Sequence, residues 1–392
     1  MRATYTRRFA AAAIAVMVGG LVTAGGSSQA AAVRHSAPRG RLLSASPMTA
    51  YLLPGIPIPA KAWRIRYTST TATGRQTIVS GTVLVPTVAA RTAPRPLVGF
   101  AVGTQGLADR CAPSHTLTTG EEFESATIND LLKQGWAVTV TDYPGLGTPG
   151  QHTYTMGNAL GRSVLDSIRA ARQLRAAHLS RRGPAAVMGY SEGGGAAGWA
   201  AQLQPTYSPH LDLVGAAIGG VPANLQIVLR HNDGGPFSFL VPYAVVGMRA
   251  EYEGSDTGHD LTRHGRNVIR ALEQTCLQDA SNHYPPLTKL SSLTKSNLFA
   301  VPRVRHILAI NRLGRRAPAV PVLIQQSPND EIVPFRQVAT LHRQWRREGA
   351  RVTLRKLSAP DHISGSTLYV PAALTWLRNR FAAASSGVRK TV

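Results

Sequence analysis

The chain has 392 residues, of which 43% are hydrophobic, so it holds enough apolar material for a buried core and is not a wholly disordered protein. Its formal net charge is +23, but the 43 Lys and Arg are scattered and form no block typical of a nucleic-acid-binding tail, so we expect no nucleic-acid partner. Two cysteines exclude a zinc ribbon, an Fe–S ligand set and a disulfide-dense small domain.

Residues 1–32 have the pattern of an export signal. Three Arg among the first eight residues precede an uncharged apolar run over residues 9–24, and small residues then offer cleavage after Ala30 or Ala32. The run is shorter than the ~20 residues that span a bilayer, although an uncleaved membrane anchor is the alternative interpretation. Cleavage would remove three Arg and no acid, which leaves +20 on a secreted or envelope protein.

Export also bears on the two cysteines, Cys111 and Cys276. In an oxidising compartment they can form one disulfide that closes a long loop. The alternative is a pair of buried, inert thiols. We expect the disulfide.

The predicted elements indicate an α/β fold. Residues 65–69 and 77–85 alternate apolar and polar side chains, which predicts the antiparallel edge of a sheet. Short apolar runs bounded by Gly and Pro then predict strands buried on both faces of a parallel sheet. These runs cover residues 96–102, 136–141, 185–188, 213–218 and 321–325, with a last strand at 352–357.

Helical patterns separate these strands, at residues 125–133, 164–174, 192–203, 335–348 and 368–381. We therefore expect a mostly parallel central sheet with helices on both faces. The alternation stops in the middle of the chain, which predicts an inserted, mainly helical cap. The expected organisation is a signal at 1–32, a core at 33–220, the cap at 221–306, the rest of the core at 307–381 and a frayed tail at 382–392.

The sharpest local signal is Gly189-Tyr190-Ser191-Glu192-Gly193, a G-x-S-x-G sequence. It follows an apolar strand and opens a Gly- and Ala-rich helix, which is the context of a nucleophile elbow. A glycine-rich turn with an incidental serine is the alternative. The pattern favours Ser191 as a catalytic nucleophile.

A serine nucleophile needs a base and an acid that orients the base, in the chain order Ser, Asp or Glu, His for this type of fold. His362 is the predicted base because it lies on a loop between a strand and a helix, whereas His342 falls within a helix rich in Arg and His306 closes the cap. Asp330 is the predicted acid, since it follows the strand at 321–325. Glu331 is its closest rival.

The oxyanion hole of such an enzyme uses the backbone N–H after the nucleophile and one from the loop after an early strand. The first donor is therefore predicted at Glu192. The second is predicted at Gln105, within the Gly-containing loop of residues 103–109. That loop can also be an ordinary glycine turn.

Over about residues 50–380 the chain resembles the secretory lipase family of fungi and actinobacteria. The blocks that carry the resemblance are residues 111–114, 189–194, 219–222, 233–237, 330–334 and His362. It implies an α/β-hydrolase with a helical cap, the triad Ser191, Asp330 and His362, and a disulfide between Cys111 and Cys276. It also favours Asp330 over Glu331. The fungal members have an acidic residue at the place of Gln105.

The implied reaction is acyl transfer from a lipid or small ester through an acyl-enzyme on Ser191, with no metal or other cofactor. A peptidase or acyltransferase, or a non-catalytic envelope-binding protein, are the alternatives. We expect a monomer without a transmembrane anchor after cleavage, drawn by its positive charge to anionic lipid interfaces. Apolar residues of the cap form either an acyl-binding wall or the cap's own core: Phe237, Phe239, Leu240, Val241, Tyr243, Val245, Val246 and Met248.

Overall fold

One large sheet organises the computed structural model, which describes residues 38–253, 255 and 257–387. The expected export signal at residues 1–32 lies outside the described residues. Within them, nine strands follow the order β1-β4-β5-β7-β6-β8-β9-β10-β11. In chain order these are β1 (Leu42–Met48), β4 (Ala60–Thr70), β5 (Gln76–Pro86), β6 (Leu97–Ala101), β7 (Ala137–Thr141), β8 (Ala185–Tyr190), β9 (Leu213–Gly219), β10 (Val322–Gln326) and β11 (Val352–Lys356).

The sheet has an antiparallel edge and a parallel remainder, as the sequence predicts. Strands β1, β4, β5 and β7 pair antiparallel, and β4 and β5 stay in register from Ala60 opposite Pro86 to Thr70 opposite Gln76. From β7 to β11 every pairing is parallel. Strands β6, β7 and β10 are buried along their whole length, so apolar residues predominate in β6 and in the first half of β10. The threonines of β7 and the glutamines of β10 are buried as well.

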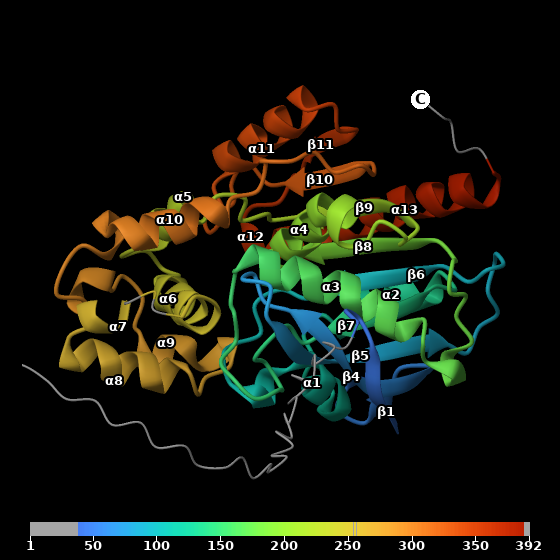
Figure 1. Ribbon diagram of the computed structural model, residues 1–392, viewed down its shortest axis with the longest axis horizontal. Helices are drawn as coiled ribbons and strands as arrows, with labels where there is room; N and C mark the ends of the chain where they lie inside the picture. The colour runs from blue at the N-terminus through green and yellow to red at the C-terminus, as the bar shows by residue number, and fades with distance from the viewer. Residues whose placement is uncertain (1–37, 254, 256, 388–392) are drawn as a thin grey trace, which may run out of the picture. The chain divides into compact units, whose positions relative to one another are not determined.

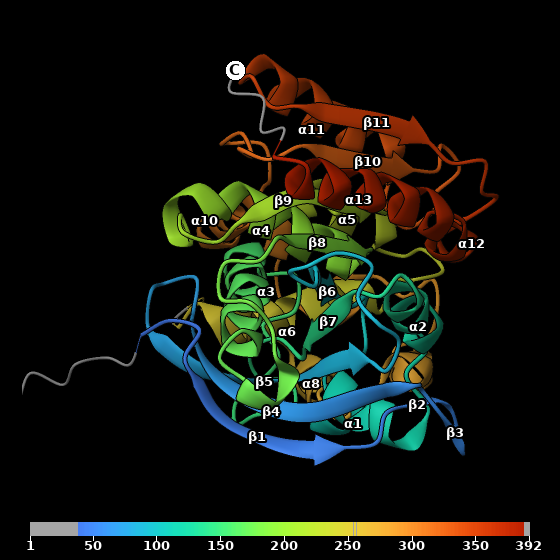
Figure 2. The same cartoon turned by 90° about the vertical axis from the view of Figure 1, so that its right-hand side faces the viewer.

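Helices cover both faces of this sheet (Figures 1 and 2). One face carries α3 (Gly157–Ala171), α4 (Glu192–Tyr207) and α11 (Phe335–Arg347), and the other carries α2 (Ser125–Lys133) and α13 (Val370–Ser385). The chain therefore has the α/β-hydrolase arrangement that was expected. The α13 helix ends at Ser385, so the expected frayed tail at 382–392 begins inside a helix.

Between β9 and β10 the chain leaves the sheet and forms the cap, beside the carboxyl ends of the parallel strands (Figure 1). Its α-helices are α5 (Leu225–Asn232), α6 (Leu240–Glu251), α7 (Thr257–Asp260), α8 (Arg263–Leu272), α9 (Ala280–His283) and α10 (Pro302–Ile310). The last of these crosses residue 306, the expected end of the cap. This helix continues to Ile310, and β10 begins at Val322.

Cys111 and Cys276 form the expected disulfide, with their Cα atoms 5.5 Å apart. It joins a 3-10 turn of the core (η1, Asp109–Cys111) to the cap, just before η3 (Leu277–Asp279). Gly106 makes the close approach possible: its φ is +133°, and a β-carbon there would lie 2.6 Å from the Cα of Cys276. No helix among the described residues has the length and apolar character needed to cross a membrane.

Some elements are absent from the sequence-based prediction. Strand β1 is exposed at most of its positions, and a short hairpin, β2 (Tyr51–Leu53) and β3 (Ile56–Pro57), offers too few residues for a periodic signal. Two short helices, α1 (Pro113–Thr119) and α12 (His362–Leu368), are also new. Helix α12 begins at His362 itself, and α1 begins two residues after Cys111.

Candidate active site

Ser191 lies at the sharp turn between β8 and α4, where its backbone has φ +57° and ψ −124°. A non-glycine residue rarely adopts this conformation, so the surroundings must hold it. The Ser191 N–H donates to the carbonyl of Gly219 at 3.0 Å. Only glycine fits at the flanking positions, because a β-carbon on Gly189 would clash with the carbonyl of Gly193, and one on Gly193 with that of Ala101. The G-x-S-x-G pattern is thus a packing requirement of the elbow.

His362 lies at the start of α12, after the carboxyl end of β11, and its side chain contacts the serine hydroxyl. Its Nε2 lies 2.9 Å from the Oγ of Ser191. The histidine is held through its backbone as well: Tyr190 donates its hydroxyl to the His362 carbonyl at 2.9 Å, and the Glu331 carboxylate accepts from the His362 N–H at 2.8 Å. The ring is buried, which fixes its orientation toward Ser191.

Asp330 completes a hydrogen-bonded chain of three side chains. Its Oδ2 lies 2.7 Å from His362 Nδ1, and its Oδ1 accepts the backbone N–H groups of Ile332 at 3.1 Å and Val333 at 2.6 Å. Gln326 donates a further bond to Oδ2 at 2.7 Å. Both oxygens of the Asp330 carboxylate therefore make hydrogen bonds, which keep the group from rotating away from the ring.

The rival acids have other partners. Glu331 bonds the His362 backbone and not its ring. Asp361, which directly precedes His362, accepts the N–H of Ser364 at 2.6 Å and caps α12. The structure thus brings together the three residues that the sequence selects and assigns separate structural contacts to their neighbours.

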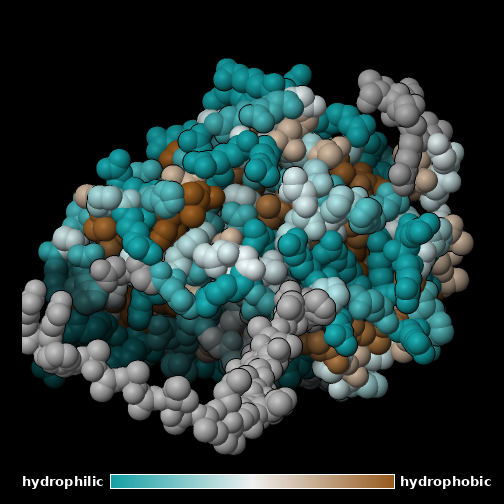
Figure 3. Space-filling model, in the orientation of Figure 1, coloured by the Kyte–Doolittle hydropathy of each residue, from teal (hydrophilic) through white to brown (hydrophobic). Residues whose placement is uncertain are grey.

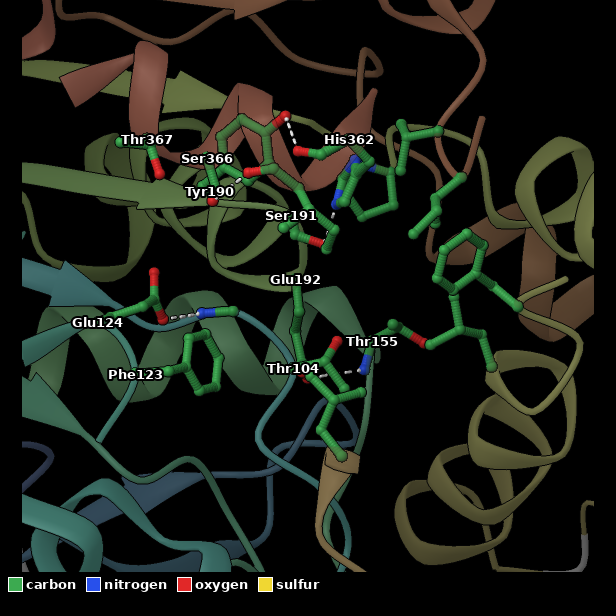
Figure 4. Close-up of a pocket in the computed structure, with 18 of the residues that line it drawn as sticks. Thr104, Phe123, Glu124, Thr155, Tyr190, Ser191, Glu192, His362, Ser366 and Thr367 are labelled. Atoms are coloured by element: carbon green, nitrogen blue, oxygen red, sulfur yellow. Dashed lines mark hydrogen bonds between the residues drawn. The ribbon is translucent and has the colours of Figure 1, made fainter. Parts of the chain in front are cut away.

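A cavity of about 600 Å³ opens over Ser191 and His362, between the core and the cap. Figure 4 shows Ser191 between His362 on one side and Glu192 and Thr104 on the other. The lining is mainly apolar and comes from α5, α6, α12, the start of α13 and the loop before α2. Its apolar members include Phe123, Leu225, Val228, Leu229, Phe237, Phe239, Leu240, Leu277, Ile332, Val333, Ile363 and Val370.

The apolar cap residues divide between the two roles that the sequence left open. Phe237, Phe239 and Leu240 line the cavity. The other five are buried elsewhere in the cap and are not part of the lining: Val241, Tyr243, Val245, Val246 and Met248. Most of these eight apolar residues therefore belong to the core of the cap, and Phe237, Phe239 and Leu240 face the cavity.

The two expected oxyanion donors differ in position. Glu192 lines the cavity directly after Ser191. Gln105 does not: its side chain donates to Glu122 at 3.2 Å, and its carbonyl accepts from Leu277. Gly103 and Thr104 of the same loop line the cavity instead, and a β-carbon built on Gly103 would lie 3.9 Å from that of Ser191. The cavity lining therefore includes Gly103 and Thr104 of the expected loop and does not include Gln105.

Two carboxyl groups that the sequence analysis did not select, those of Glu122 and Glu124, lie beside this loop. Burial raises the pKa of Glu122 to about 7, and burial together with the neighbouring Glu122 raises the pKa of Glu124 well above its ordinary value. Glu192 is buried too, with one oxygen 3.2 Å from His152 Nε2. The sequence does contain a signal for these groups, because residues 120–124 hold three of the chain's 20 acidic residues.

Comparison with known proteins places this site in a family context. The family model described as secretory lipase matches residues 110–387. Lipase 4 of Candida albicans is 30% identical over 349 residues, which cover 83% of this chain and 74% of the relative. A Mycobacterium tuberculosis protein named as a probable inactive lipase is 28% identical over 90% of this chain and 80% of its own length. Lipase A of Candida antarctica in its closed state superposes with a TM-score of 0.80 at 22% identity, covering 89% of this chain and 83% of the other.

Proposed function

We propose that this chain, which belongs to the secretory lipase family, is an exported lipolytic ester hydrolase that forms an acyl-enzyme on Ser191. The observation that carries the mechanism is the hydrogen-bonded series Ser191, His362 and Asp330 beneath a mainly apolar cavity. One relative is named as probably inactive, so family membership alone does not establish activity. The proposal for this chain therefore depends on the contacts among Ser191, His362 and Asp330.

The first chemical step is attack of Ser191 Oγ on the ester carbonyl carbon. As the C–O bond forms, the hydroxyl proton passes to His362 Nε2, which lies 2.9 Å away. Asp330 keeps the other ring nitrogen protonated and stabilises the imidazolium that results. The carbonyl electrons move to oxygen and give a tetrahedral oxyanion.

The oxyanion requires hydrogen-bond donors that are already in place. We assign one to the backbone N–H of Glu192 and the second to the loop of residues 103–109. Within that loop Thr104 is favoured over Gln105, because Thr104 lines the cavity and Gln105 does not. Each such donor contributes roughly 3 kcal/mol of transition-state stabilisation in hydrolases of this kind.

Collapse of the tetrahedral intermediate breaks the bond to the alcohol, which leaves with the proton from His362. Water then attacks the acyl-enzyme, His362 accepts its proton, and the acid departs as Ser191 recovers its hydrogen. The apolar lining from α5 and α6 suits an apolar acyl group. These contacts support an ester of a fatty acid as substrate.

Export is part of the same proposal. The pattern of residues 1–32 predicts translocation, and the disulfide between Cys111 and Cys276 is of the kind that persists in oxidising compartments. Family membership agrees with this location.

Hydrolysis of p-nitrophenyl esters from acetate to palmitate, by the wild type and by Ser191→Ala, tests the function. We expect turnover by the wild type and a loss of about 10⁴-fold or more in the variant. Equal turnover by both proteins would contradict the assignment of Ser191. Folded wild-type protein without turnover on any ester would favour a non-catalytic binding role.

A further inference from the structure

The loop of residues 103–109 is held from two sides. On the cap side its backbone pairs with residues 275–277, including a bond from the Leu277 N–H to the Gln105 carbonyl at 2.9 Å and a bridge between Gly106 and Cys276. The disulfide at Cys276 reinforces this side. The covalent and backbone contacts fix the second half of the loop.

On the other side, two carboxyl groups hold the first half. Glu124 Oε2 accepts the N–H of Gly103 at 2.6 Å (Figure 4). Glu122 accepts the side-chain amide of Gln105 at 3.2 Å and the N–H of Glu124 at 3.1 Å, and its other oxygen accepts the Thr116 hydroxyl at 2.7 Å. The Glu124 contact is the one nearest the nucleophile, because Gly103 lies beside Ser191.

The charge state of these carboxyl groups matters because the reaction builds negative charge next to them. Glu122, Glu124 and the buried Glu192 lie together, and no Lys or Arg forms an ion pair with any of them in the described part of the chain. A nearby carboxylate would oppose an oxyanion, whereas a neutral carboxylic acid would not. A neutral acid still accepts a backbone N–H through its carbonyl oxygen.

We propose that Glu124 is a positioning residue that holds the oxyanion loop through Gly103, and that it does so as an uncharged carboxylic acid. The inference rests on the proposed hydrolysis at Ser191. The raised pKa of Glu124, caused by burial and by Glu122, agrees with it. Glu124 touches the loop and needs no contact with the reacting atoms for this role.

Among the described residues, the remaining ionisable groups around Glu124 include no Lys or Arg. They are Glu122 on its own segment, Glu192 on α4, the phenols of Tyr143 and Tyr369, and Asp130 and His362 in the cavity lining. Burial raises the pKa of both phenols well above 10, so these stay neutral. Ionisation of Glu124 would therefore add an unbalanced negative charge near the oxyanion.

Two substitutions separate the contact from the charge. Glu124→Gln keeps an oxygen that accepts the Gly103 N–H and cannot ionise, so we expect kcat within about threefold of wild type at pH 6 to 7. Glu124→Ala removes the acceptor and frees the loop, so we expect kcat to fall roughly 10- to 100-fold with little change in KM. Glu121→Gln is the matched control, because Glu121 is exposed and its carboxylate contacts Thr119 rather than the loop.

The pH dependence tests the charge state. Raising the pKa of an acid keeps it protonated to higher pH, and ionisation then removes activity as pH rises. The ratio of kcat for Glu124→Gln to that for wild type should therefore increase about tenfold from pH 6 to 10, and the ratio for Glu121→Gln should stay flat. Glu122 is retained in all three proteins, so a pH-dependent ratio that appears in Glu124→Gln and not in Glu121→Gln requires the Glu124 carboxyl.

A trifluoromethyl ketone, which Ser191 converts to an oxyanion, supplies a second measurement. Its affinity should fall in parallel with kcat in Glu124→Ala and recover in Glu124→Gln. Activity of Glu124→Ala equal to wild type, equal losses in both variants, or a flat pH ratio would overturn the proposal. Absence of any Ser191-dependent turnover in the wild type would instead overturn the proposed function, and circular dichroism identifies a variant that fails to fold.

Discussion

Two adjacent acids, Asp330 and Glu331, have separate tasks at the His362 loop. Asp330 bonds the ring at 2.7 Å, and Glu331 bonds the backbone N–H of the same residue at 2.8 Å. Both contacts orient the histidine, but only the first sets which ring nitrogen carries the proton. The two carboxylates therefore should differ greatly in their effect on catalysis.

Replacing Asp330 by Asn should lower kcat by about 10³- to 10⁴-fold, because the amide favours the wrong tautomer of His362. Glu331→Gln, the neighbouring matched change, keeps an acceptor for the His362 N–H and should cost less than about tenfold. Steady-state kinetics on p-nitrophenyl butyrate compare the two variants. Equal losses would mean that Asp330 acts only through the loop's structure.

The sequence identifies the three side chains of this series because each one follows a strand of a parallel sheet, and carboxyl ends of such strands share one edge. The carboxyl partners of Gly103 and Gln105 were not predictable in this way. Glu122 and Glu124 reach the loop only after the chain has folded α1 and the segment before α2 against it, and no periodicity encodes that contact. The sequence also could not show that Thr104 rather than Gln105 lines the cavity, because the two are adjacent on an irregular loop.

At the scale of elements, burial decides what the sequence reveals. Strands β6, β7 and β10 lie inside the sheet and are buried at every position, and their high content of apolar residues makes them evident in the sequence. Strand β1 lies at the exposed edge and contains Ser44, Ser46 and Pro47, so its sequence gives no clear strand pattern. The cavity combines residues from α5, α6, α12 and α13, and its lining follows from packing that the sequence alone does not give.

A bulky side chain in the cap should narrow the acyl-binding part of the cavity. Val228 lies on α5 in the lining, so Val228→Trp should lower the ratio of palmitate to butyrate turnover by roughly tenfold or more. Leu287→Trp is the control, because Leu287 is 69% exposed and is not part of the lining. An unchanged ratio for Val228→Trp would place the acyl chain elsewhere.

The disulfide joins the cap to the core across 165 residues of sequence. Replacing Cys111 and Cys276 together by Ser should reduce the free energy of unfolding by about 2–5 kcal/mol. Urea denaturation of the wild type and the double variant measures this difference. A change below about 0.5 kcal/mol would show that the backbone pairing between residues 105–108 and 275–277 suffices without the covalent bond.

At the scale of the whole molecule, the excess of basic residues lies outside the site. Among the described residues that line the cavity none is Lys or Arg, although the chain has 43. Hydrophilic residues cover much of the surface shown in Figure 3, with smaller apolar areas between them. The positive charge can thus act on distant charged surfaces without altering the reacting groups.

Binding to anionic phosphatidylglycerol vesicles should therefore weaken steeply between 20 and 500 mM salt, while turnover of p-nitrophenyl acetate stays constant. Vesicle cosedimentation and the soluble-ester assay, run in the same buffers, measure both. Equal sensitivity of turnover to salt would mean that the charge acts at the active site, contrary to the composition of the cavity lining.

Covalent labelling with a p-nitrophenyl alkylphosphonate tests the nucleophilic role of Ser191 most directly. Attack by Ser191 Oγ on phosphorus expels p-nitrophenolate and leaves a stable phosphonyl-serine. Mass spectrometry should show one adduct per chain, on the peptide that carries Ser191, with parallel loss of ester hydrolysis and no adduct in Ser191→Ala. An adduct at another residue, or full activity in the labelled protein, would contradict the account.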